Sequence, residues 1–301
     1  MPTRVRNAGD HLLALWHLAR PAIWLVSIVP FMLGFMLASG RILPRAGGAG
    51  DFGLAVFVIG PLVWAAALLI NDAADLEGDR GNPRRARSPM VRGRVSVRFA
   101  VIAAHAAAAL AIVLGLLVNG SFAILVAAFL AVAWAYSVPP VRLKTRPGAD
   151  VAANAIGIGA IVVLAGWSVA APVGAFPFWF LGQSMLVTTA LYVPSALVDL
   201  EADVAVGYRT IATALGRARA FAIGRACWVA CNLAALGLAA TGQVLPRAML
   251  PVLVVAVPVL IVAYERLIGR ATSPRAMVRG LIVLSFLFLA SNVAFVVLSV
   301  R

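Results

Sequence analysis

Long apolar segments, separated by short polar breaks, follow one another along almost the whole chain. A membrane-crossing helix needs about 20 mostly apolar residues, and nine segments of that kind are present. Open sheet edges cannot be satisfied in lipid, and the sequence lacks the alternating pattern of a β-barrel. We therefore expect an all-α, polytopic membrane protein. The expected spans are approximately 22–40, 53–71, 98–117, 121–137, 151–171, 175–198, 218–241, 247–268 and 278–299.

The first 20 residues differ from the rest because three arginines surround a short mixed segment that ends before Pro21. We expect residues 1–20 to form an interfacial segment, since the apolar stretch that follows is too long for a secretory signal. Residues 21–299 then form the nine-helix part. The chain, 1–301, is expected to be a single membrane domain without a soluble appendage.

Composition supports this class and adds an orientation. Soluble domains carry about 25% charged residues, whereas this chain has 12% charged and 63% hydrophobic residues. The net charge of +14 lies in basic clusters between the spans, which is typical of topology signals rather than of a nucleic-acid-binding surface. With a cytoplasmic N-terminus, almost all of the 25 basic residues face the cytoplasm. We expect an integral protein of a bacterial inner membrane, with the N-terminus and the long polar loops in the cytoplasm.

The cysteine and histidine residues do not indicate a metal site, a disulfide or a catalytic base. Cys227 and Cys231 lie four positions apart in an apolar segment, where packing is a better interpretation than a disulfide or a structural metal site. His105 lies on an apolar helix face and is expected to be a hydrogen-bonded structural residue. No histidine lies near the polar runs that follow, so the sequence names no general base.

Seven of the eleven acidic residues are concentrated in two short runs, at the predicted cytoplasmic ends of the second and sixth spans. On a helix, Asp72, Asp75 and Asp79 share one face, and Asp199 and Asp203 lie one turn apart. Such rows of hard oxygen ligands suit Mg²⁺, which commonly combines one or two carboxylates with substrate phosphates. The runs are Asn71-Asp72-Ala-Ala-Asp75-Leu-Glu77-Gly-Asp79 and Asp199-Leu-Glu201-Ala-Asp203.

Two other interpretations of the acids stay open. They pair with the arginines that crowd residues 80–98, which is the stronger interpretation for Glu77 and Glu201 because these lie off the main face. Alternatively, a non-enzymatic transporter uses intramembrane acids as an ion pathway. That interpretation predicts ionisable residues near mid-span, whereas here they lie at the ends of the apolar segments.

Basic residues close to the runs are candidates for binding a diphosphate, because guanidinium forks match phosphate oxygens. Topology signals and lipid-headgroup contacts are the competing role. Pro139 and Pro140 end the fourth span and stiffen the loop that carries two of these candidates. The candidates are Arg84, Arg142, Lys144 and Arg209.

Together these motifs resemble the intramembrane aromatic prenyltransferases of the UbiA superfamily. The signature Asn-Asp-x-x-Asp-x-x-x-Asp is complete at 71–79, a second aspartate motif resembles 199–210, and a Tyr-Ser-x-Pro-Pro-x-Arg-Leu-Lys loop matches 136–144. The chain departs from an Arg-Thr-x-x-Arg-Pro element of many members, where it has Arg84-Arg85-Ala-Arg87-Ser88-Pro89. Arg209 stands where lysine is frequent.

The resemblance implies nine helices around a central cavity, in which the two acidic rows hold Mg²⁺ and the diphosphate of an isoprenoid donor. Ionisation gives an allylic carbocation, which a lipophilic acceptor attacks within the membrane. A membrane terpene cyclase of the same fold, acting on the prenyl diphosphate alone, is the alternative. The implied metal-binding residues are Asn71, Asp72, Asp75, Asp79, Asp199 and Asp203, of which Asp75, Asp79, Asp199 and Asp203 are also named catalytic.

Aromatic residues of the spans are candidates for the prenyl channel, since aromatic faces tolerate cationic charge. Packing or anchoring at the membrane interface is the competing role for each of them. The sequence leaves the acceptor and the length of the prenyl chain open, although the 136–147 loop looks closer to members that act on polyprenyl, carotenoid or chlorophyll-type lipids than to hydroxybenzoate enzymes. The channel candidates are Tyr136, Trp64, Trp134, Trp167 and Phe180.

Overall fold

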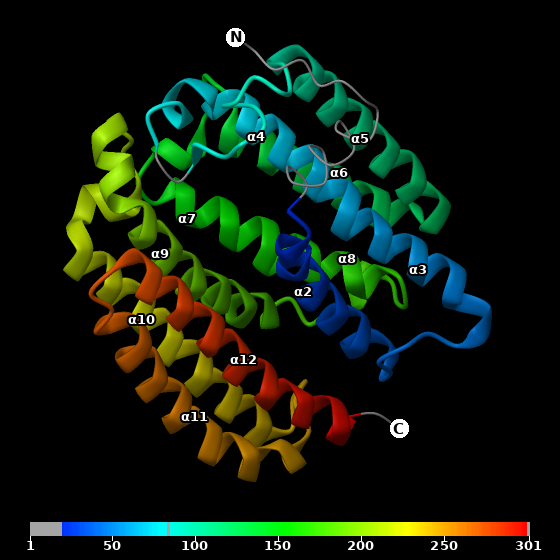
Figure 1. Cartoon of the computed structure of the whole chain (residues 1–301). Helices are drawn as coiled ribbons and strands as arrows, with labels where there is room; N and C mark the ends of the chain where they lie inside the picture. The colour runs from blue at the N-terminus through cyan, green and yellow to red at the C-terminus, as the bar shows by residue number, and fades with distance from the viewer. Residues whose placement is uncertain (1–19, 83–84, 300–301) are drawn as a thin grey trace. The chain divides into compact units, whose positions relative to one another are not determined.

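The computed structural model describes residues 20–82 and 85–299, and within them the chain is helical, with no strand (Figure 1). Nine helices of this part are long and apolar enough to cross a membrane, which confirms the predicted class, number and order of the spans. The predicted interfacial segment 1–20 lies outside the described residues except for Arg20. The nine are Pro21–Ser39, Ala46–Asp79, Val97–Val118, Gly120–Ser137, Ala149–Ser168, Phe180–Val206, Ile211–Thr241, Arg247–Gly269 and Pro274–Leu298.

The largest boundary differences concern the polar ends of the helices. The second span was expected to end at residue 71 and the sixth at residue 198, but the helices continue to Asp79 and Val206. An apolar window stops at the first charged side chain, whereas backbone hydrogen bonds continue through alanine, leucine and glutamate, which are good helix formers. Both acidic runs are therefore helical, as the spacing argument assumed.

The helices form two compact units. Unit 1 takes in Met1–Phe35, Leu43–Leu143 and Ile161–Gly174, and unit 2 takes in Met36–Ile42, Lys144–Ala160 and Ala175–Arg301. The first acidic run belongs to unit 1 and the second to unit 2. The single domain over 1–301 and the central cavity stay predictions.

In unit 1, α4 (Val63–Asp79), α5 (Val97–Val118) and α6 (Gly120–Ser137) lie side by side (Figure 1). The loop between α4 and α5 is folded onto these helices because Met90 and Val95 are buried in its course. The hydrophobic cluster that covers them consists of Leu69, Ile70, Ala100 and Ala104. This anchoring holds the second half of the loop against α4 and α5.

Unit 1 also contains α2 (Pro21–Ser39) as far as Phe35, and the close approach of this part to α8 (Val162–Ser168) depends on two glycines. A Cβ at Gly34 would collide with the main chain of Val163, and one at Gly166 with the main chain of Phe31. The absence of both side chains lets the backbones touch. The stretch of α2 around Phe31 and Gly34 is thereby held against α8.

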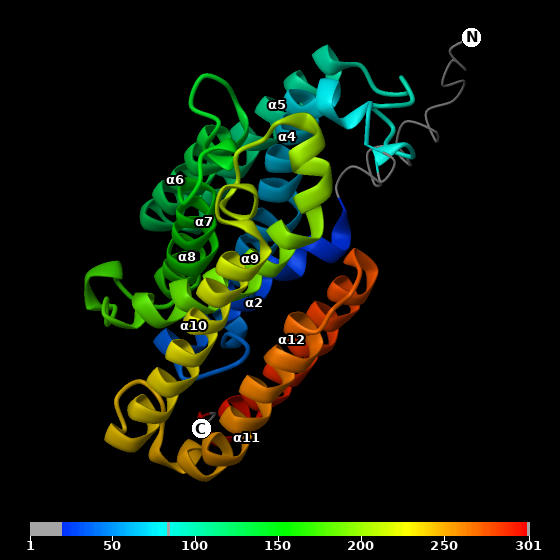
Figure 2. The same ribbon diagram turned by 90° about the vertical axis from the view of Figure 1, so that its left-hand side faces the viewer.

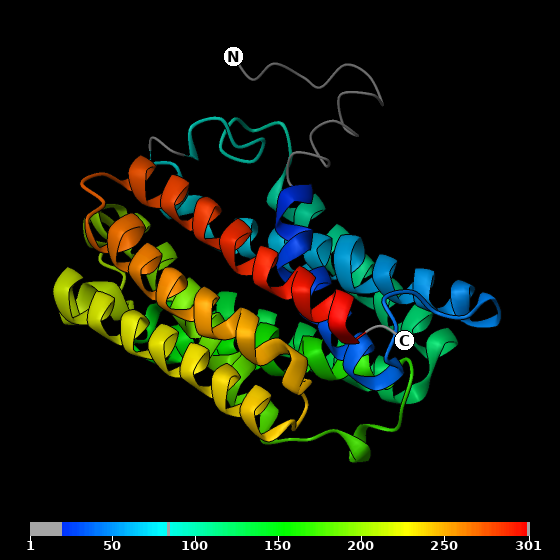
Figure 3. The same ribbon diagram turned by 90° about the horizontal axis from the view of Figure 1, so that it is seen from below.

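In unit 2, α9 (Phe180–Val206) packs along α10 (Ile211–Thr241), and α11 (Leu250–Tyr264) lies beside α12 (Pro274–Ser299) (Figures 2 and 3). Their core is built around two large buried side chains that stack with ring centroids 5.6 Å apart, Trp228 and Tyr264. Each also satisfies its polar atom: the indole N–H donates to the Leu260 carbonyl at 2.9 Å, and the phenol donates to the Ala190 carbonyl at 2.9 Å.

Both cysteines lie on α10 and are free thiols. Cys231 is buried in the core cluster of unit 2, and Cys227 packs against the same cluster. The packing role expected from the sequence is confirmed for both.

Candidate active site

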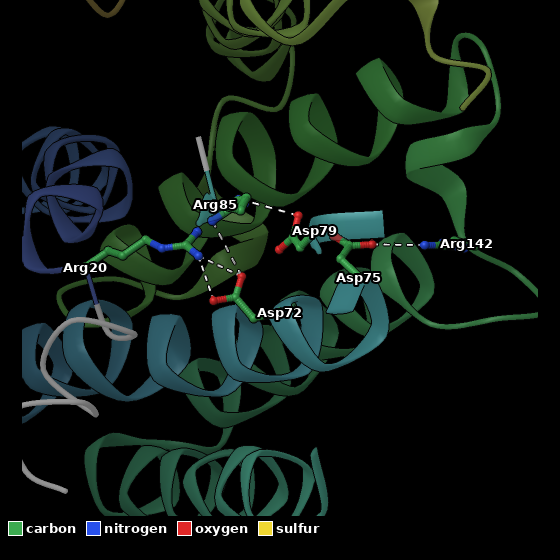
Figure 4. A network of polar contacts seen from close by, with 6 residues as sticks. All are labelled: Arg20, Asp72, Asp75, Asp79, Arg85 and Arg142. Carbon is green, nitrogen blue, oxygen red and sulfur yellow. Dashed lines mark hydrogen bonds and ion pairs between the residues drawn. The ribbon is translucent and has the colours of Figure 1, made fainter. Parts of the chain in front are cut away.

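Asp72 is the most enclosed carboxylate of the first run. It is 2% exposed, and both of its oxygens accept hydrogen bonds from Nη2 of Arg20 at 2.7 Å (Figure 4). Charge-assisted contacts of this length are among the stronger hydrogen bonds in proteins. Sequence reasoning missed Arg20, because the arginine lies 52 positions away, before the first span.

Asp75 faces a different arginine. Its Oδ1 accepts a hydrogen bond from Nη2 of Arg142 at 3.0 Å, and Arg142 belongs to the proline-stiffened loop that follows α6 (Figure 4). The end of α6 makes a second link, since the buried Ser137 hydroxyl donates to Oδ1 of Asn71 at 3.1 Å. The Tyr-Ser-x-Pro-Pro-x-Arg motif thus contacts the first acidic run inside unit 1, as two of its residues, 137 and 142, each touch α4.

Arg85 completes the set. Its guanidinium lies 3.6 Å from Asp79 and 3.8 Å from Asp72 (Figure 4). One side chain can reach both only because the two aspartates share a helix face, which confirms the spacing argument. Glu77, expected to lie off this face, is exposed. The candidate from the sequence, Arg84, lies outside the described residues.

The backbones of two of these arginines are unusual. Among the described residues, only three that are not glycine have a positive φ, and they are Arg20 (φ 43°), Arg142 (φ 40°) and Val244. Such a conformation is disfavoured for side chains with a Cβ and persists where the surrounding structure enforces it, often at functional sites. Two of the three cases therefore coincide with guanidinium groups that are held against the aspartates of α4.

The second run has a different setting. In α9, Asp199 is exposed and Asp203 half-buried, one helical turn apart. Gly207 ends the helix in the left-handed conformation (φ 80°), and the exposed Arg209 follows it. Thr210 then caps α10 through a reciprocal capping box with Thr213. Lys144, in a separate loop of unit 2, is buried.

A fully buried carboxylate, Asp150, connects those two loops of unit 2 and was missed by sequence reasoning. Its oxygens accept hydrogen bonds from the backbone N–H groups of Gly148 and Ile211, both at 2.8 Å. The only sequence signal was an acid in the first turn of a predicted helix, where the helix dipole favours negative charge.

The aromatic channel candidates are all half-buried except for Phe180, which is buried. Trp64 donates its indole N–H to the Ser27 hydroxyl at 2.8 Å, and Trp167 donates to the Pro172 carbonyl at 3.0 Å. These contacts show packing and anchoring, while the lining of a channel by the aromatic candidates, Tyr136 included, stays a prediction.

Trp134 packs against His105 with ring centroids 5.4 Å apart. The histidine Nδ1 lies 2.8 Å from the Val101 carbonyl and donates to it, since a carbonyl oxygen accepts only. The expectation of a hydrogen-bonded structural histidine is confirmed.

The oxygen atoms on α4 suit a hard divalent cation as ligands, because carboxylate and amide oxygens lie in a row beside cationic groups. No trio of acidic, histidine or cysteine side chains converges within the part of the chain that the structure describes. Mg²⁺ does not require such a trio, since it typically uses one or two carboxylates with water and phosphate oxygens. The residues present therefore fit a metal that binds together with a phosphorylated substrate.

Solved structures share this fold. A UbiA homologue from Archaeoglobus fulgidus bound to DMAPP and Mg²⁺ superimposes with a TM-score of 0.72 at 22% identity, covering 94% of this chain and 98% of that one. The same homologue bound to GPP and Mg²⁺ gives a TM-score of 0.71 at 23% identity. At this level of identity, the likeness establishes the nine-helix fold.

Relatives by sequence include two kinds of enzyme. A lycopene elongase/hydratase from Halobacterium salinarum is 30% identical over 262 residues, covering 85% of this chain and 89% of the relative. A 4-hydroxybenzoate octaprenyltransferase from Albidiferax ferrireducens is 32% identical over 226 residues, covering 72% and 71%. The model of the UbiA prenyltransferase family matches residues 27–292. The resemblance seen in the motifs and the expected enzyme class are thus confirmed, and the chain belongs to the UbiA prenyltransferase family.

Proposed function

We propose that this protein transfers a prenyl group from an isoprenoid diphosphate to a lipophilic acceptor within the membrane, in a reaction that depends on Mg²⁺. One observation carries the proposal: three aspartates in a row on α4 are each paired with a guanidinium group of the same unit. The row supplies oxygen ligands for a cation, and the arginines supply donors for a diphosphate. Both halves of a metal-diphosphate site are thus present at one helix end.

The chain's own residues would then have distinct roles. Asn71, Asp75 and Asp79 would hold metal from the first row, and Asp199 and Asp203 from the second. Asp72 keeps its place in the proposed set, although it is the most enclosed member. When bound, Mg²⁺ supplies Lewis-acid stabilisation of the leaving diphosphate.

The arginines would exchange partners as the site fills. A guanidinium group binds phosphate oxygens with the same fork geometry that it uses for a carboxylate. Arg20, Arg85 and Arg142 neutralise carboxylates in the present structure. With those carboxylates holding metal, the same guanidinium groups would orient the diphosphate, together with Lys144, Arg209 and Arg84.

Relatives support the substrate class. The solved homologue from Archaeoglobus fulgidus binds DMAPP and GPP, each with Mg²⁺. The relatives by sequence are named for lycopene and for 4-hydroxybenzoate as substrates, so the comparison leaves a carotenoid-type lipid and a phenolic acid as two acceptor classes. We propose the lipid as the acceptor, because the sequence of the 136–147 loop resembles that of members that act on such lipids. From the distribution of basic residues, we also propose a bacterial inner membrane with the site facing the cytoplasm.

The test uses the full chain reconstituted in lipid nanodiscs with labelled prenyl diphosphates of increasing length. Separate samples receive lycopene, 4-hydroxybenzoate or no acceptor, with Mg²⁺ or with a chelator, and products are identified by mass spectrometry. We expect a prenylated lipid only with Mg²⁺ and acceptor. A cyclic hydrocarbon without acceptor would identify the terpene cyclase alternative, and no diphosphate release in any sample would overturn both.

A further inference from the structure

Asp150 is an anion that serves two helix starts at once. It lies in the first turn of α7 (Ala149–Asn154) and has no exposed surface. One carboxylate oxygen accepts from the N–H of Gly148, directly before α7, and the other accepts from the N–H of Ile211, the first residue of α10. The first N–H groups of a helix have no partner inside the helix, so an anion placed there satisfies them and complements the helix dipole.

Asp150 and Ile211 lie 61 positions apart, and each of the two helix starts directly follows a loop with basic side chains. The loop before α7 carries Lys144, and the loop before α10 carries Arg209. The phenol of Tyr192, from α9, lies 3.5 Å from the same carboxylate and adds the helix that bears the second acidic run. Asp150 is therefore the shared attachment point of three segments within unit 2.

We propose that Asp150 is a positioning residue for diphosphate binding: it fixes the Lys144 loop and the Arg209 loop relative to each other, so that both basic side chains reach one diphosphate. This inference rests on the proposed function and deepens it. Burial explains why the carboxylate acts through the loops rather than on substrate. Loss of its negative charge leaves two backbone donors competing for a weaker acceptor, and the loops lose their fixed spacing.

The test measures binding of Mg²⁺-pyrophosphate to the full chain by calorimetry, and the KM for the prenyl diphosphate. For Asp150→Asn we expect the Kd for Mg²⁺-pyrophosphate and the KM for the prenyl diphosphate to rise about tenfold, which corresponds to the loss of roughly one charge-assisted hydrogen bond. The kcat and the KM for the acceptor should be nearly unchanged. Trypsin should also cleave faster after Arg209. Ile211→Pro is the second variant, because proline is well tolerated at the first helical position and lacks the N–H that donates to Asp150. It also replaces a buried side chain, for which the control below allows.

Two variants control for lost packing and stability. Ile211→Val shortens the same side chain but keeps the N–H group, and Tyr264→Phe removes a buried hydrogen bond of unit 2 that touches neither loop. Both should bind Mg²⁺-pyrophosphate as the unaltered chain does. Unchanged affinity in Asp150→Asn and Ile211→Pro, or equal losses in the controls, would overturn the positioning role while leaving the prenyltransferase proposal intact. Failure of the unaltered chain to bind would overturn both.

Discussion

The two acidic runs share the pattern Asp-Leu-Glu-small residue-Asp, but their surroundings differ. In the first, the carboxylates themselves are fixed: Asp72, Asp75 and Asp79 each face an arginine within unit 1. In the second, Asp199 is exposed, and the loops before α7 and α10 converge on the buried Asp150. A repeated motif therefore predicts a repeated ligand chemistry, but not a repeated environment.

This difference has an energetic reason. Three carboxylates on one helix face at a membrane boundary repel one another, so the enclosed row needs counter-charges before any metal arrives. Two acids one turn apart on a more exposed helix end are screened by water and need fewer. We infer that the first run is charge-balanced before a metal binds, by arginines of its own unit.

The largest expected effect is the loss of transfer on neutralising either row. Asp75→Asn and Asp203→Asn should each lower kcat/KM about a thousandfold or more, because each removes a proposed ligand of the Mg²⁺ that would stabilise the leaving diphosphate. Initial rates with a saturating acceptor measure this. Glu77→Gln and Glu201→Gln are the matched controls, since both glutamates are exposed; losses there as large as in the aspartate variants would contradict the helical-face argument.

A smaller but distinct effect is expected for the Arg20–Asp72 pair, which should stabilise the fold. Breaking a buried ion pair costs about 3–5 kcal/mol, and because the Arg20 side chain is 24% exposed we expect a coupling energy of about 1–3 kcal/mol. Denaturant titration of Arg20→Ala, Asp72→Ala and the double variant measures the coupling as a double-mutant cycle. Arg41→Ala, an exposed arginine, is the control. Additive losses would mean that the pair carries no net energy.

The sequence was sufficient for the fold because hydropathy reports directly on lipid. Each span has its own apolar window, so number and order followed without knowledge of contacts. The helix ends did not follow, since the windows stopped at the first charge while the backbone of α4 continued to Asp79. Packing details such as the approach of α2 to α8 at Gly34 and Gly166 depend on which helices meet. No single apolar window contains that information.

For the site, the sequence predicted ligand types but not their partners. The shared face of Asp72 and Asp79 follows from helical spacing alone, and one arginine reaches both. Arg20 could not be found this way, because its carboxylate lies 52 positions later. Asp150 was overlooked because a lone acid in a helix start is common, and its second partner, Ile211, is set by the packing of unit 2.

Next in size is the effect of removing Arg85, the guanidinium that bridges two aspartates. Arg85→Ala should raise the KM for the prenyl diphosphate about tenfold, the equivalent of one or two exposed charge-assisted contacts, and leave the acceptor KM unchanged. Arg87→Ala, exposed in the same basic loop, is the control. Equal effects of the two would indicate a general electrostatic attraction by the loop, and the charge-balanced row would then lose its special role.

The smallest expected effect separates the two runs most directly. Asp199→Asn should change the free energy of unfolding without Mg²⁺ by no more than about 0.5 kcal/mol, as for other exposed positions, although it should weaken binding of Mg²⁺-pyrophosphate. Asp75→Asn should lower stability measurably, because it leaves Arg142 facing a neutral group. Thermal unfolding of both variants with and without Mg²⁺-pyrophosphate makes the comparison, since a ligand stabilises only the protein that binds it. If Asp199→Asn destabilises the metal-free protein as much as Asp75→Asn does, the greater exposure of Asp199 does not separate the two runs.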